Sequence, residues 1–389
     1  MAVPDPSTAV AYLAQVPQAL QATARAHTDR AQWQGAAGGA LAIIVFWLIL
    51  KSGLLVRLRR EAEHEAPRPW LASLLCAFAF LGLSALLMLP WTAFIAWRGE
   101  PAGAAHGFDL PTFIMASLRQ AAPWIIEGMI GLALICAAMR QAPRTWWIWC
   151  ATAGAVMTIT VVWLPFALAS GPTSLPAVPA GPTRDGLLRL VRETRLPVTE
   201  VYVAPISGLD ANVTGVPRQA RVWISQGLLD KASPAEVRAN VAHLIGHFRN
   251  FDDLTMAILL AALIGGGCYA MRALYGPAVV LLGARDLDGP ADPASLPVLA
   301  AIAVVWLAPA GIAFNTFDRL VNVRADQFSL DHAREPDGLA AVLLRDWRGD
   351  KVDPSPLEEA IFYDHPSLKS RVLHAMAWKA AHPAPKAAS

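Results

Sequence analysis

The sequence predicts a mostly α-helical, polytopic membrane protein with a water-exposed α+β domain that is split in two. Of its 389 residues, 55% are hydrophobic and only 16% are charged, and the mean hydropathy of +0.41 is typical of membrane proteins. Most of its long apolar runs reach the roughly 20 residues that a helix needs to cross a bilayer. Two polar segments, 171–253 and 315–378, lie between and after these runs.

Six apolar runs are predicted to be transmembrane helices, and tryptophans near their ends fit the membrane–water interface. Helices 1–4 fall within 37–170, and helices 5 and 6 fall within 254–314. The individual runs are 37–56, 70–97, 123–139, 146–169, 254–282 and 296–314. The last two runs therefore interrupt the polar domain as a membrane hairpin.

The two ends of the chain differ in character. Residues 1–36 lack the basic start and short apolar core of a cleavable signal peptide, and we predict an N-terminal helix, amphipathic or facing solvent, that leads into the first span. Residues 379–389 form an Ala/Pro-rich tail that is predicted to be disordered.

Charge and cysteine placement exclude some functions. The net charge of +2 is small for this length and indicates no nucleic-acid partner, whereas the apolar runs imply contact with membrane lipids. All four cysteines fall inside apolar runs, which predicts neither a disulfide framework nor a zinc ribbon. The basic residues that flank the runs leave the side on which the polar domain lies open, and the oligomeric state stays open too.

A well-marked helix in the first polar segment carries two histidines. Ser233, Pro234 and Glu236 form a capping box with proline at the first helical position, which predicts a helix from Pro234 to about residue 250. His243 and His247 lie four residues apart on one face, so their imidazoles can share one zinc ion. The pair alone is a weak signal, since two such histidines are more often solvated or packed in a core.

The sequence before this helix contains short apolar stretches. Val201–Val203 and Arg221–Ile224 are separated by glycines and a proline, and we predict that they form two short strands packed over the helix.

Several motifs taken together resemble the membrane-embedded CAAX prenyl endopeptidases and their HtpX-like bacterial relatives, which are zinc metallopeptidases with a gluzincin-type α+β core. The similarity extends from about residue 22 to residue 378. The motifs are Ala211-Asn212-Val213-Thr214-Gly215, Gly227-Leu228-Leu229, the His243 helix, Asn322-Val323-Arg324-Ala325-Asp326, and Phe362-Tyr363-Asp364-His365-Pro366-Ser367 with Arg371 after it.

The resemblance implies a role for each motif. His243, His247 and position 322 correspond to the three zinc ligands, position 244 to the general base, and Asp326 to a residue that supports a ligating histidine. His365 corresponds to a residue near the active centre. Asn212, Val213, Gly215 and Arg371 are implied to bind substrate, with backbone groups near Asn212–Gly215 pairing with an extended peptide.

The departures fall on the two glutamates that hydrolysis requires. Leu244 occupies the base position, and leucine cannot take a proton from a zinc-bound water. Asn322 occupies the third-ligand position, and a neutral amide is a poor zinc ligand compared with a carboxylate. We therefore expect zinc to be bound weakly or not at all.

Some nearby side chains are candidate substitutes. Asp318, Asn322 and Asp326 are spaced four apart along one helical face, so Asp318 or Asp326 could supply an oxygen ligand. His365 could complete the site or contact a substrate carbonyl. Asp253 has the spacing of a third ligand in another protease clan, but we expect the helix to continue through it.

Three hypotheses follow for a protein expected in a bacterial inner membrane. The first is a pseudoprotease that binds peptide or lipidated-peptide ligands without efficient hydrolysis. The second is an active or repurposed metalloendopeptidase in which a substitute joins His243 and His247. The third is a structural or regulatory membrane subunit whose site residues are relics.

Overall fold

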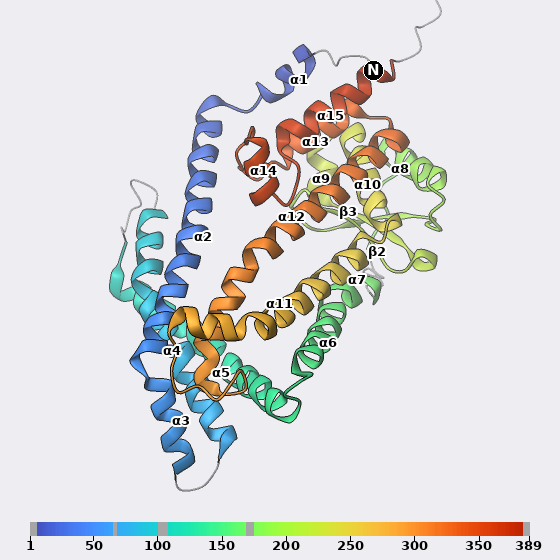
Figure 1. The fold of residues 1–389 in the computed structure, drawn as a ribbon. Helices are drawn as coiled ribbons and strands as arrows, with labels where there is room; N and C mark the ends of the chain where they lie inside the picture. The colour runs from blue at the N-terminus through green and yellow to red at the C-terminus, as the bar shows by residue number, and fades with distance from the viewer. Residues whose placement is uncertain (1–5, 65–67, 100–107, 169–174, 384–389) are drawn as a thin grey trace, which may run out of the picture. The chain divides into compact units, whose positions relative to one another are not determined.

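The computed structural model describes residues 6–64, 68–99, 108–168 and 175–383. The start of the predicted domain at residue 171 and the last residues of the tail lie outside these ranges. The chain forms two compact units. An α+β unit contains residues 1–30, 157–260 and 311–389, and a helical unit contains residues 31–156 and 261–310 (Figure 1).

Within the described residues, six helices are long and apolar enough to cross a membrane, which confirms the predicted polytopic, mostly α-helical class. They are α2 (Gln18–Ser52), α4 (Pro69–Gly99), α5 (Leu110–Gln141), α6 with its π-helical continuation (Trp146–Trp163), α11 (Asp252–Leu282) and α12 with the 3-10 turn before it (Pro293–Ala333). Between α2 and α4 lies α3 (Leu54–His64), whose Arg59 pairs with Asp288 at 2.6 Å and with Asp292.

The N-terminal segment differs from the single predicted helix. It forms α1 (Pro6–Leu13) and then the first turns of α2, with a break that ends at Pro17. Proline lacks the N–H that a continuous helix would use and disfavours helical geometry in the residue before it. The second helix then runs without interruption into the first span.

The sheet of the α+β unit has three strands in the order β1-β3-β2. Strand β1 (Val201–Ala204) is parallel to β3 (Arg221–Ser225), and β2 (Ala211–Thr214) is antiparallel to β3. The two strands predicted from apolar stretches are present, and β2 adds a third at the sheet edge. Gly215 follows β2 with φ of +97°, and a side chain there would lie 2.6 Å from the Gln219 carbonyl oxygen.

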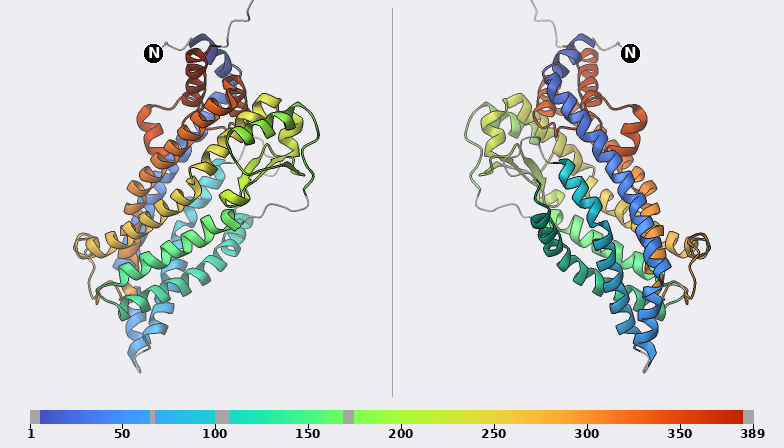
Figure 2. Two further views of the ribbon diagram at one scale, coloured as in Figure 1. Left: turned by 90° about the vertical axis from the view of Figure 1, so that its right-hand side faces the viewer. Right: turned by 90° about the vertical axis from the view of Figure 1, so that its left-hand side faces the viewer.

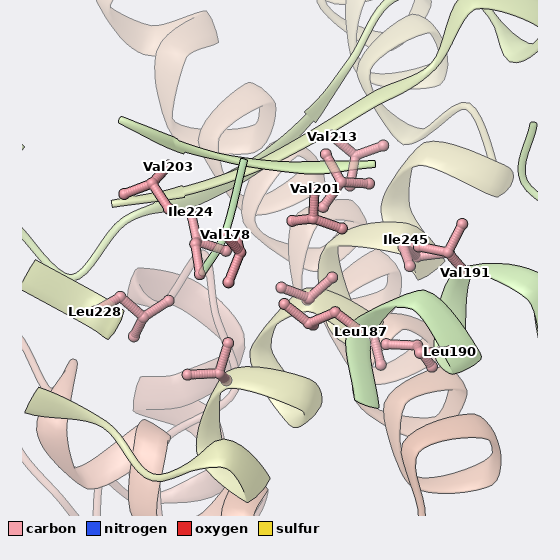
Figure 3. Packing of buried hydrophobic residues seen from close by; sticks show 14 residues of the cluster. Val178, Leu187, Leu190, Val191, Val201, Val203, Val213, Ile224, Leu228 and Ile245 are labelled. Carbon is pink, nitrogen blue, oxygen red and sulfur yellow. The ribbon is translucent and has the colours of Figure 1, made fainter. Parts of the chain in front are cut away.

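Helices α8 (Pro182–Glu193) and α10 (Pro234–Arg249) pack against this sheet and enclose the main hydrophobic core. Figure 3 shows valines and Ile224 of the strands near Leu187 and Leu190 of α8 and Ile245 of α10. This core fixes one face of α10, so the face that carries the histidine pair is fixed as well. A short helix, α9 (Gln226–Lys231), connects β3 to α10.

The rest of the α+β unit follows the interruption by α11 and α12, which can be followed from two sides in Figure 2. Helices α13 (Pro336–Arg345), α14 (Pro356–Phe362) and α15 (Leu368–Ala381) complete it. Helices α13 and α15 form a second core with α1, in which Ala9 and Val16 are buried. The short helix α7 (Leu164–Leu168) follows α6.

A candidate metal centre without a base

The histidine helix begins with a complete capping box. The Ser233 side chain accepts from the backbone N–H of Glu236, and the Glu236 carboxylate accepts from the backbone N–H of Ser233 at 2.7 Å. These bonds satisfy N–H groups that a helix start leaves free and set where α10 begins. His243 and His247 therefore lie in its last two turns.

The two imidazoles face each other. Their Nε2 atoms are 3.0 Å apart, and their ring planes meet at 82°. Burial lowers the pKa of His243 to about 4, so this ring is neutral at neutral pH. The two Nε2 atoms are therefore close enough to contact the same metal ion.

Each Nδ1 atom lies beside a carboxylate. His243 Nδ1 is 2.8 Å from Asp326 Oδ1, although the angle falls short of a directed hydrogen bond. His247 Nδ1 is 2.8 Å from Asp252 Oδ2. A carboxylate favours a proton on the nitrogen that faces it. Both Nε2 atoms then present lone pairs to each other, an arrangement that a cation or a proton between them would stabilise.

Cationic residues hold the two supporting carboxylates. Arg371 donates to Asp326 through Nε at 2.7 Å and Nη2 at 2.6 Å, and Arg324 donates to Asp252 at 3.0 Å. Asp326 is only 2% exposed. Its two oxygens are thus engaged by Arg371 and His243, which leaves it poorly suited as the substitute ligand considered from the sequence. Arg371, which was predicted to bind substrate, orients Asp326.

The residue predicted to occupy the third-ligand position is uncharged. Asn322 is buried on α12, and its amide nitrogen donates to the main-chain oxygen of Asp318 at 2.9 Å and to its Oδ1 at 3.2 Å. The amide leaves at most a neutral oxygen for a metal. Leu244, at the predicted base position, packs against the main hydrophobic core.

The donor set therefore fits a weak two-imidazole cation site and does not fit a hydrolytic zinc centre. Such a centre needs three protein ligands that hold the ion and a group that moves the proton of its water. His243 and His247 meet part of the first requirement, and Leu244 fails the second.

The expected substrate-side residues lie in two places. Asn212 and Val213 belong to edge strand β2, where Val213 is buried in the core and Asn212 is partly exposed. His365 lies in the turn after α14, with Nδ1 3.0 Å from Asp364 Oδ1, and this contact lowers the pKa of Asp364. Asp318, Asp364 and His365 each place a possible ligand atom within 4.8 Å of the others.

The structure corrects the prediction that the histidine helix continues through Asp253. The predicted continuous helix ends at Arg249, and α11 begins at Asp252 after Phe251, which has φ of +53°. The neighbouring Asp252 contacts His247, and sequence reasoning missed it together with Arg324 and Asp364. The adjacent acidic pair Asp252-Asp253 was the available signal for this contact.

A polytopic helical protein with a histidine pair on the helix that packs under a small sheet has the architecture of a membrane metallopeptidase. Residues 183–379, just over half of the chain, match the model of Peptidase family M48. The chain belongs to this family. The resemblance to HtpX-like and CAAX-type proteases is thereby confirmed.

Individual proteases are similar to this chain in sequence. The chain is 29% identical over 160 residues to "Protease HtpX homolog" of Acaryochloris marina (strain MBIC 11017), which covers 40% of this chain and 52% of that relative. It is 28% identical over 208 residues to "Protease HtpX" of Stutzerimonas stutzeri (strain A1501), covering 47% and 68%. The chain thus spans about half the length of the first relative.

A solved structure shares the fold. The crystal structure of S. mikatae Ste24p matches with a TM-score of 0.55 at 16% identity, covering 84% of this chain and 81% of that chain. The six apolar helices of the described residues and these relatives show that the chain is an integral membrane protein. Helical spans of this kind are typical of a bacterial inner membrane, whereas outer membranes hold β-barrels.

Proposed function

We propose that this M48-family membrane protein is a pseudoprotease that binds peptide or lipidated-peptide segments without efficient hydrolysis. The observation that carries the proposal is the placement of Leu244. Its side chain packs against the core at the position where the family's chemistry needs an acid/base group. Losing such a group typically costs on the order of 100-fold to 10,000-fold in rate.

The surroundings of the lost centre support a retained binding role. The supporting pairs His243–Asp326 and His247–Asp252 are intact, and Arg371 and Arg324 hold their carboxylates. A centre that kept only its fold would not need these ordered charges. These ion pairs hold the side chains around His243 and His247 in fixed positions.

Strand β2 supports an extended peptide as the ligand. It pairs with β3 on one side and is the edge of the sheet as ordered in the described residues. An edge strand presents main-chain N–H and C=O groups that an added strand can pair with. Gly215 ends this strand at a backbone conformation that other residues rarely adopt.

The test measures binding and cleavage on the same detergent-purified protein with added Zn²⁺. An unstructured peptide carrying a fluorophore and quencher, with and without a C-terminal prenyl group, should bind but show no cleavage above that of His243→Ala. Ala211→Pro should weaken binding, because the Ser225 N–H bonds to Asp210 and the alternation of an antiparallel ladder then points the Ala211 N–H away from β3; Ala211→Ser should retain binding. Cleavage that His243→Ala abolishes, or an absence of peptide binding, would overturn the proposal.

An active metalloenzyme with a substitute ligand is the alternative. The position of Asp318 one turn before Asn322 favours it, since a carboxylate is present near the lost one. Metal content by mass spectrometry tests it directly. Near-stoichiometric zinc that is lost in His243→Ala would favour this alternative over the pseudoprotease.

A further inference from the structure

A second group of metal-binding side chains lies outside the histidine pair. Asp318 comes from α12, and Asp364 and His365 come from the turn between α14 and α15. One ligand atom of each lies within 4.8 Å of the other two. Neither His243 nor His247 belongs to this group.

The segment that carries two of these donors is fixed against the helix that carries the third. Arg319 donates to the main-chain oxygens of Glu359 at 2.8 Å and Ala360 at 3.1 Å, and also to that of Tyr363. Asn315 donates to the oxygen of Ile361 at 2.8 Å. These bonds come from residues on both sides of Asp318 and hold the end of α14 close to it.

The donor chemistry suits a divalent cation. Two carboxylates and one imidazole are ligand types that Zn²⁺ accepts, and they also suit Mn²⁺. Asp364 and His365 have 59% and 41% of their side chains exposed, so an ion can enter and keep water ligands. Asp326, by comparison, is buried and engaged by Arg371.

One member of the group lies close in sequence to the position predicted for the family's third ligand. Asp318 precedes Asn322 by four residues, which is about one turn or 5.4 Å along a helix. The carboxylate absent at 322 is thus present one turn earlier, beside two further donors. Asn322 donates to Asp318 Oδ1 and leaves Oδ2 for another partner.

We propose that Asp318, Asp364 and His365 form a divalent-cation site, displaced by one helical turn from the metal position of the family. The site holds the turn after α14 against α12. It does not depend on whether the chain hydrolyses or binds peptides.

The experiment titrates Zn²⁺ and, separately, Mn²⁺ into the full-length metal-stripped protein in detergent, followed by calorimetry. Asp364→Asn and Asp318→Asn should each weaken binding at this site by at least roughly 10-fold, since loss of a supporting group alone can cost that much. Asp353→Asn is the matched control, because Asp353 is an exposed carboxylate paired with Lys369 on the same part of the unit. It should bind as the wild type does.

Because Asp364 is exposed, its asparagine variant is expected to fold even where Asp318→Asn does not. Co²⁺ absorption gives a second readout, since its visible spectrum should change in His365→Ala and stay unchanged in the control Asp353→Asn. Binding that survives Asp364→Asn, binding that His243→Ala abolishes, or no binding of either ion would overturn the site. Peptide cleavage would overturn the pseudoprotease and leave this site standing, so the two failures are distinguishable.

Discussion

Asp252 and His247 contact each other across a break between two helices. The ring nitrogen Nδ1 and the carboxylate oxygen Oδ2 are 2.8 Å apart, although α10 ends at Arg249 and α11 begins at Asp252. Phe251, with φ of +53°, turns the chain between them. The contact orients the ring so that its other nitrogen meets His243, and the first residue of a membrane-spanning helix thereby supports the candidate metal centre.

Placing glutamates at both predicted positions should raise zinc affinity more readily than it gives peptide hydrolysis. In Leu244→Glu with Asn322→Glu, position 322 regains a charged ligand, so zinc affinity should rise well above that of the wild type. Leu244→Glu alone should leave zinc affinity nearly unchanged, because the base is not a ligand. Metal content and peptide cleavage are the measurements. A folded double variant that still binds no zinc would show that these positions do not correspond to the family's site.

Glu236 should stabilise the histidine helix in a pH-dependent way. Burial alone would raise its pKa, but hydrogen bonds with Ser233 and the ion pair with Arg345 outweigh burial and hold the pKa below its ordinary value. Its contribution is therefore present above the unfolded pKa of about 4.3 and is lost as pH falls below it.

Glu236→Gln should accordingly lower the unfolding free energy by about 1–3 kcal/mol at pH 7 and by much less near pH 3. Thermal unfolding in detergent at both pH values measures the difference. The exposed Asp230→Asn serves as control and should change stability by less than about 0.5 kcal/mol. An equal effect of Glu236→Gln at both pH values would contradict the ionic contribution.

Gly246 should be intolerant of a methyl group. A Cβ there would lie 3.0 Å from the Cβ of Phe328 and 3.2 Å from the Cα of Ala325 on α12, where neither neighbour can easily move. Gly246→Ala should destabilise the α+β unit by about 1–3 kcal/mol through overpacking.

The matched helical substitution is Gly35→Ala, whose Cβ would meet no atom within 4 Å. It should be neutral or stabilising by up to about 1 kcal/mol, because alanine is the better helix former. Comparing the two unfolding midpoints tests the close approach of α10 and α12. Equal effects would mean that these helices can separate without cost.

The N-terminal helix should be an integral part of the α+β unit. Ala9 is 1% exposed in the second core, whereas its neighbour Val10 is 61% exposed. Ala9→Asp should destabilise the unit by at least about 2 kcal/mol, because it buries an unpaired charge, and Val10→Asp should be nearly neutral. Limited proteolysis should release the N-terminal segment sooner in the first variant, and similar cleavage of both would argue against this packing.

The sequence predicted those features that local patterns determine. The capping box at Ser233 and Glu236 defined the histidine helix to within a residue, and the apolar runs identified six spans. The strands at Val201 and Arg221 followed from short apolar stretches between glycines and proline. Each of these depends on neighbours a few residues apart.

The remaining features depend on contacts between distant residues. Arg371 and Asp326 are 45 positions apart, and Arg324 and Asp252 are 72 apart, so no spacing rule pairs them. The grouping of Asp318 with Asp364 and His365 likewise joins residues more than 40 positions apart. The break at Phe251 was missed because the apolar run of α11 continues the helical pattern without a glycine or proline.

The packing of α1 against α13 and α15 has a consequence for biosynthesis. Tyr12 donates to Asp337 at 2.9 Å, so a residue that precedes the apolar helices in the chain contacts one that follows them. Domains usually fold from the N-terminus as they are made. Here α13 and α15, which pack against the N-terminal helix, follow the apolar helices in the chain, so this part of the second core can form only after they are translated. The segments before and after the spans must therefore reach the same side of the membrane. Correct insertion of every span is required before α1 can pack against α13 and α15.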